Sequence, residues 1–120
     1  MQPIDLSLAL KATDGDIVLL RDVVEAFLDE YPTLLTQLEA ALLAGDNALI
    51  QRSSHTIKGS LRLFGKGPSQ ELAGILEEMG ASGSLENGTQ TFESLKLSLA
   101  GLRRQLLVAM KNLSDSRRPN

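Results

Sequence analysis

Apolar residues recur every three to four positions over most of this chain, the spacing that places them on one side of an α-helix. The pattern predicts a first helix over residues 16–44, a second over 47–65 and a last one over 85–112. A third helix is predicted to begin at Pro68 and to stop at the glycine-containing stretch 80–83. The repeating apolar positions of the first helix are Ile17, Leu20, Val24, Phe27, Tyr31, Leu34, Leu38 and Ala41.

Prolines and glycines divide these segments. Pro32 lies inside the first one, and because proline lacks an N–H and crowds the preceding turn, we expect two nearly continuous helical pieces there. Gly45 is suited to end that segment, and Asp46 to cap the next. Pro68 fits the first turn of the third helix, where no backbone donor is needed.

The short connections between these segments make successive helices antiparallel neighbours. The sequence therefore predicts an all-α fold, an antiparallel up-down four-helix bundle. A weaker apolar pattern over residues 4–11 predicts a short additional N-terminal helix that covers one end. The polar residues 114–120 are expected to form a flexible C-terminal tail, so that residues 1–113 make a single helical domain.

Composition removes several functional classes. The 120 residues include no cysteine and one histidine, which excludes disulfides and zinc sites that need thiolates or two imidazoles. A net charge of -3 argues against nucleic acid as the partner. No apolar run approaches the ~18 residues of a membrane span. The N-terminus carries Asp5 and no basic residue before its short apolar stretch, so it is not expected to be a signal peptide. A cytoplasmic monomer is expected.

The single histidine, His55, lies in the second predicted helix. Each helical residue advances by about 100° around the axis, so with His55 at zero the core-facing residues cluster at about 140–240°. These residues are Ile50, Ser53, Ile57, Ser60, Leu61 and Phe64. The residues within about 60° of His55 are Gln51, Lys58, Gly59 and Arg62, and Lys66 is expected to continue that line. The histidine is therefore predicted to face solvent, beside glycine and positive charge.

The neighbours of His55 suggest its chemistry. Gly59 costs about 0.5–1 kcal/mol relative to alanine inside a helix, which is reasonable if a partner or ligand must approach the imidazole closely. Lys58 is placed to balance the charge of an anion on the ring, and a phosphoryl group is the simplest such anion. The alternatives are a solvated basic face for Lys58, Arg62 and Lys66, and close helix packing for Gly59.

The motif HTIKGS at residues 55–60, followed by LFG at 63–65, resembles that of histidine-containing phosphotransfer (HPt) domains of multistep phosphorelays. The resemblance extends to residues 27–32, 38–46 and 76–77. It implies a phosphoryl carrier without kinase activity of its own. Such a carrier takes the group from an aspartyl phosphate of one receiver domain and passes it to the aspartate of another.

The resemblance also implies roles for individual residues. His55 is the phosphoacceptor, with Nε2 the attacking nitrogen, while Lys58 stabilises the phosphoryl group and Gly59 permits the close approach of the receiver. Glu77 is a candidate for orienting the imidazole ring. The residues expected to contact the partner are Gln51, Ser54, Arg62 and Lys66.

Two positions depart from the family pattern. Ser54 stands directly before the histidine, where alanine is common in the family. Lys66, Gly67 and Pro68 follow Gly65 where the family usually has a small residue and an unbroken approach to the next helix. The second departure is expected to change the loop near the partner surface and therefore which receivers bind there.

The partners that the resemblance implies are response-regulator receiver domains and a hybrid sensor histidine kinase. Mg²⁺ belongs to the acidic pocket of the receiver, so no cofactor is expected on this chain. Two alternatives stay open. The bundle is a helical adaptor or dimerisation module with an incidental histidine, or it is the phosphoacceptor domain of a histidine kinase. That last class usually has an acidic residue after the histidine, where this chain has Thr56.

Overall fold

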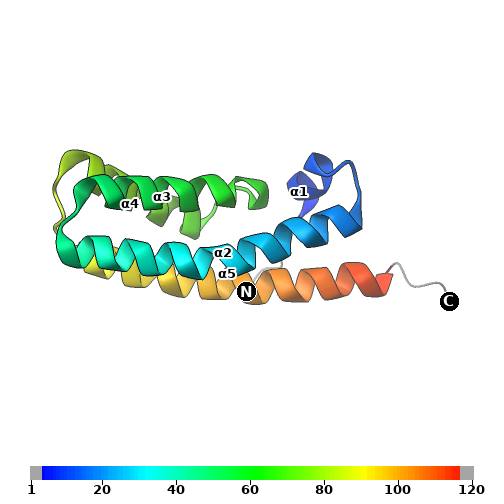
Figure 1. Ribbon diagram of the computed structural model, residues 1–120. Helices are drawn as coiled ribbons and strands as arrows, with labels where there is room; N and C mark the ends of the chain where they lie inside the picture. The colour runs from blue at the N-terminus through cyan, green and yellow to red at the C-terminus, as the bar shows by residue number, and fades with distance from the viewer. Residues whose placement is uncertain (1–3, 117–120) are drawn as a thin grey trace.

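The computed structural model describes residues 4–116, and none of these residues lies in a β-strand. The α-helices are α1 (Ser7–Ala12), α2 (Ile17–Ala44), α3 (Asn47–Ser60), α4 (Pro68–Ser82) and α5 (Gly88–Ser116), and η1 (Leu61–Phe64) is a short 3₁₀ helix. The two long helices α2 and α5 lie side by side, and α3 and α4 pack over one half of their length (Figure 1). Helix α1 lies over the other half, next to η1 and α2. The predicted all-α antiparallel bundle with a short N-terminal helix is confirmed.

Helix α2 continues through Pro32 without interruption. The expectation of two helical pieces was therefore wrong. Leu28, Tyr31 and Leu35 are all buried on either side of the proline, so the apolar side of the helix keeps one phase across it. Packing of that continuous side offsets the ~3 kcal/mol that an interior proline costs a helix.

The connection between α2 and α3 forms as the sequence predicts. Gly45 ends α2 in the left-handed conformation, with φ of 66°. Asp46 then caps α3, since its carboxylate accepts a hydrogen bond from the Leu49 N–H at 3.1 Å. This tight reversal makes α3 an antiparallel neighbour of α2.

Helix α3 is shorter than predicted. It ends at Ser60, and η1 and a three-residue connection, 65–67, follow before α4 begins at Pro68. Gly65 has a φ of 80°, a conformation that side chains with a Cβ rarely adopt, and it turns the chain out of η1. Lys66 lies in this connection, so the expectation that it continues the helical line of His55 was wrong.

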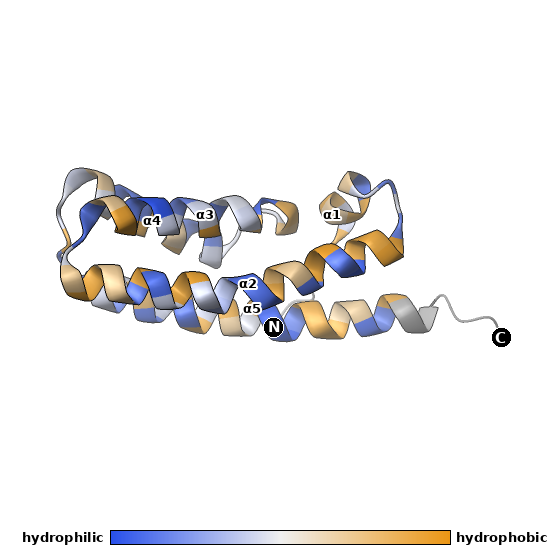
Figure 2. Ribbon diagram, viewed as in Figure 1, coloured by the Kyte–Doolittle hydropathy of each residue, from blue (hydrophilic) through white to orange (hydrophobic). Residues whose placement is uncertain are grey.

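The bundle core is built mainly from leucine. Figure 2 shows apolar and polar residues alternating along α2 and α5, as expected for helices with one buried side. In α3 and η1 the predicted core positions Ile50, Ser53, Ile57 and Leu61 are buried, and Ser60 and Phe64 are half-buried. The fully buried leucines are Leu20, Leu38, Leu76, Leu95, Leu99 and Leu106.

At its C-terminal end, α5 runs through Ser116. The first three residues of the predicted tail, 114–116, are therefore helical, and residues 117–120 lie outside the described part of the chain. Among the described helices, none is both long enough and apolar enough to cross a membrane.

Helices α3 and α4 approach each other closely at Gly80. A Cβ on this residue would lie 2.5 Å from the backbone nitrogen of Gln51 and 2.8 Å from the carbonyl oxygen of Asn47. Gly80 is buried inside α4, which continues to Ser82. The glycine therefore serves helix packing rather than helix termination, and it sets the distance between the two helices.

We predict that Gly80→Ala lowers the free energy of unfolding by about 1–3 kcal/mol, because the added methyl group meets backbone atoms that cannot move independently. Gly74→Ala is the matched control in the same helix, since a Cβ there would lie 3.7 Å from the flexible Lys58 side chain. That variant should be as stable as the wild type or more stable by about 0.5–1 kcal/mol. Urea unfolding monitored by circular dichroism measures both, and equal losses in the two variants would contradict this account of Gly80.

Candidate functional site

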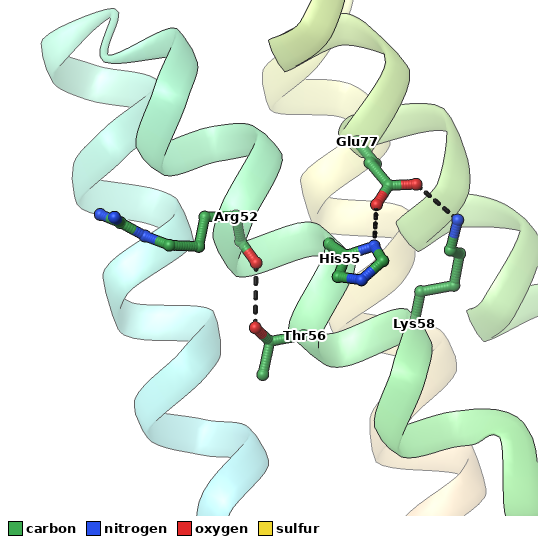
Figure 3. A network of polar contacts seen from close by, with 5 residues as sticks. All are labelled: Arg52, His55, Thr56, Lys58 and Glu77. Atoms are coloured by element: carbon green, nitrogen blue, oxygen red, sulfur yellow. Dashed lines mark hydrogen bonds and ion pairs between the residues drawn. The ribbon is translucent and has the colours of Figure 1, made fainter.

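His55 lies in α3 with its ring on the outside of the bundle. Its side chain is 62% exposed, as the helical spacing predicts. The ring is not free on all sides, because Nδ1 makes a hydrogen bond with Oε2 of Glu77 from α4 (Figure 3). The close packing of α3 against α4 brings these two residues together although they are 22 positions apart in the chain.

Glu77 also binds Lys58. The Lys58 Nζ donates to the second oxygen, Oε1, at a distance of 2.5 Å. The two side chains are partly buried, with 28% of Lys58 and 20% of Glu77 exposed. One carboxylate therefore joins the imidazole and the ammonium group, with each of its oxygens used once (Figure 3).

The surroundings of Glu77 favour its ionised form. The hydrogen bond from Lys58 is the main reason that the pKa of Glu77 lies below its ordinary value of 4.5, with a smaller contribution from His55 and with partial burial acting in the opposite direction. Glu77 is thus a carboxylate at neutral pH. A carboxylate only accepts hydrogen bonds, so the proton in its contact with His55 is on Nδ1. In the neutral ring this leaves the lone pair on Nε2.

Gly59 lies one turn after His55. Apart from its two chain neighbours and the adjoining backbone of α3, no heavy atom of the described chain lies within 4 Å of the position that a Cβ on Gly59 would occupy. Close packing against another helix therefore does not explain the glycine. The space beside it opens to solvent, next to the imidazole.

Three of the four predicted partner contacts lie on the surface. Gln51, Arg62 and Lys66 are exposed, although Arg62 belongs to η1 and Lys66 to the connection before α4. Thr56 is also exposed, and its hydroxyl donates to the carbonyl oxygen of Arg52 at 3.0 Å. The Arg52 side chain points toward α2 and away from His55 in Figure 3.

Ser54 does not belong to this surface. It is 0% exposed, so we withdraw it from the set of partner contacts. On the helical scale used above it lies at about 260°, next to buried Leu61 at about 240°, which is why it turns inward. Its hydroxyl has no hydrogen-bond partner among the described residues. A buried position of this kind suits alanine, the residue that is common there in HPt domains.

The contact between Lys58 and Glu77 was not predicted. The sequence places both residues near His55, but it does not show that the carboxylate binds the ammonium group as well as the ring. Within residues 4–113, whose side chains the structure describes, there is no cluster of three or more histidine, aspartate or glutamate side chains that could hold a metal ion. The site is therefore a histidine, a lysine and a carboxylate beside an open glycine.

We predict that the Glu77 contacts stabilise the fold in a pH-dependent way. The pKa of Glu77 is lower in the folded state, so its ionised form stabilises the protein above pH 4.5. This stabilisation is lost as the pH falls through the lower pKa of the folded state. The wild type should exceed Glu77→Gln by about 0.5–1 kcal/mol in unfolding free energy at pH 7. Unfolding in urea at pH 7 and at about pH 3 measures the difference. A difference that is the same at both pH values would contradict the ionic contribution.

Comparison with known proteins identifies the family. No curated protein matches the chain. The fold is similar to that in the crystal structure of histidine-containing phosphotransfer protein B (HptB) from Pseudomonas aeruginosa PAO1, with a TM-score of 0.79, 21% sequence identity and 96% of each chain covered. The family model of the Hpt domain matches residues 22–105, which include His55, Lys58, Gly59 and Glu77. Because this match spans well over half of the sequence, the chain belongs to the Hpt domain family.

Proposed function

We propose that His55 is the phosphoacceptor of this chain. Hpt domains are phosphoryl carriers rather than enzymes, and this one would take the group from a receiver aspartyl phosphate and relay it to another receiver aspartate. The observation that carries the proposal is the exposed imidazole whose Nδ1 is bound to Glu77. That contact holds the ring in place and leaves Nε2 as the nitrogen with a lone pair.

The transfer is a displacement at phosphorus. The Nε2 lone pair of His55 forms the N–P bond, while the P–O bond of the aspartyl phosphate breaks and its electron pair stays on the aspartate carboxylate. Onward transfer reverses these roles, with an aspartate oxygen of the second receiver as the nucleophile. The chain needs no kinase activity for this, since the phosphoryl group arrives on its partner.

Three neighbours would support the reaction. Lys58 lies three residues after His55 on the same side of α3, within reach of a phosphoryl group on the ring. Gly59 leaves room for the receiver to approach the imidazole, because no side chain projects from its position. Glu77 would orient the ring through its contact with Nδ1.

The charge of the surrounding segment suits a receiver. Residues 47–67 contain Arg52, Lys58, Arg62 and Lys66 and no acidic residue. A receiver presents an acidic pocket with its own Mg²⁺, and complementary charge would speed their encounter. We therefore assign Gln51, Arg62 and Lys66 to the partner surface, with receiver domains and a hybrid sensor histidine kinase as the partners of a cytoplasmic monomer.

We predict that incubation with a phosphorylated receiver gives acid-labile, base-stable label on the wild type and none on His55→Gln. His55 is the only histidine in the chain, so its replacement removes every imidazole acceptor. Circular dichroism of the variant should show unchanged helix content, because the side chain is exposed. Equal label on both proteins, or none on either after exposure to several receivers, would favour the adaptor function instead.

The open space at Gly59 should matter for transfer but not for stability. Gly59→Ala should keep or gain about 0.5–1 kcal/mol of stability, because alanine favours the helix and the site is open. Transfer from a phosphorylated receiver should slow by on the order of tenfold, since a small misplacement of reacting groups is costly. Labelling by phosphoramidate, a small donor that needs no docked protein, should be unchanged. Normal transfer from the receiver would show that Gly59 is not needed for close approach.

A further inference from the structure

Glu77 binds the two groups to which the proposed function gives separate tasks. Its Oε2 contacts Nδ1 of His55, and its Oε1 accepts from Lys58 Nζ at 2.5 Å (Figure 3). Lys58, which is to balance the phosphoryl charge, is therefore already paired with Glu77 before any phosphoryl group arrives. This arrangement has a consequence for the stability of the phosphorylated state.

A phosphoryl group on Nε2 introduces a second anion on the same ring. It carries close to two negative charges near neutral pH and has three strong acceptor oxygens, so it competes with the single charge of Glu77 for Lys58. The stem of Lys58 passes over Gly74 of α4, which has no side chain of its own. Lys58 can thus exchange one anion for the other by rotation of its own side chain.

We propose that Glu77 binds Lys58 in the unphosphorylated protein and thereby limits the stability of the phosphohistidine. When His55 is phosphorylated, Lys58 breaks its ion pair with Glu77 and binds the phosphoryl group. When that group leaves, Lys58 pairs with Glu77 again. Glu77 is a positioning residue in this scheme, because it acts through Lys58 and the ring and never bonds to phosphorus. The inference rests on the proposed function of His55 and concerns how readily that residue gives the group up.

Two effects oppose formation of the phosphohistidine. Formation of the phosphohistidine requires the ion pair of Lys58 with Glu77 to break, and the freed carboxylate then lies near a dianion of the same sign. Both effects raise the free energy of the phosphorylated state relative to the resting one. A carrier must release what it accepts, so a phosphohistidine of limited stability favours onward transfer to an aspartate.

The exchange involves a small set of charges. Among the described residues, the titratable groups in contact with Glu77 are Lys58 and His55. Its neighbour in α4, Glu78, is exposed and makes neither of these contacts. On α3, Arg52 points toward α2 and Arg62 lies beyond the helix end, in η1. Glu78 therefore offers a matched control in which the same charge is removed beside the site.

The test uses phosphoramidate as the phosphoryl donor, so that no receiver is needed. Excess phosphoramidate is added to the full chain, and ³¹P NMR gives the steady-state ratio of phosphorylated to unphosphorylated protein. Glu77→Gln keeps an amide oxygen that accepts a hydrogen bond but removes the charge that holds Lys58. We expect the ratio to rise about two- to fivefold, the range that corresponds to an ion pair of up to ~1 kcal/mol. Glu78→Gln should leave it unchanged.

A double-mutant cycle separates this mechanism from a structural effect. Lys58→Met keeps the apolar stem and removes the charge, so it should lower the ratio. Adding Glu77→Gln to Lys58→Met should raise the ratio less than Glu77→Gln does in the wild type, because only the repulsion between the carboxylate and the phosphoryl group is then relieved. An unchanged or lower ratio in Glu77→Gln, or an equal rise with and without Lys58, would overturn the inference. If the wild type gives no phosphohistidine with phosphoramidate, or if His55→Gln is labelled equally, the proposed function fails and the inference fails with it. If His55 is labelled but Glu77→Gln does not change the ratio, the inference fails and the proposed function of His55 stands.

Discussion

The close packing of α3 against α4 is the constraint on which the site depends. Gly80 lets the two helix backbones approach to a distance that even one methyl group would prevent. As a result, Glu77 of α4 reaches His55 and Lys58 of α3 directly. A wider separation would leave the carboxylate in solvent and the imidazole without a fixed orientation. The contacts of the ring thus depend on a backbone contact that lies outside the site.

The long helices α2 and α5 play a different part. They supply much of the buried leucine and form the platform on which α3 and α4 rest (Figure 1). Because α2 and α5 fill the core from one side, the opposite side of α3 does not pack against them. It can therefore expose His55 and the open space at Gly59. For an Hpt domain this division is useful, since a receiver must reach the imidazole without disturbing the bundle.

Much of the fold was predictable because helix formation depends on local spacing. Apolar residues three to four positions apart, with Gly45 and Asp46 between two segments, are enough to place α2 and α3 and to turn His55 outward. The predictions were wrong where packing between helices overrides the local preference of a residue. Pro32 did not divide α2, because buried side chains on both sides hold one helix. Ser54 turned inward because the buried arc of α3 extends about 20° further than the apolar residues alone indicated.

The sequence by itself determined the all-α bundle, the exposed histidine with Lys58 and Gly59 beside it, and the resemblance to HPt domains, since these follow from residue type and spacing within single helices. Only the tertiary structure decided that Glu77 divides its two oxygens between His55 and Lys58, and that Gly80 is a packing residue inside α4. Both are relations between helices whose residues are far apart in the chain. Such relations depend on the separation and rotation of packed helices, which the periodicity of one helix does not specify.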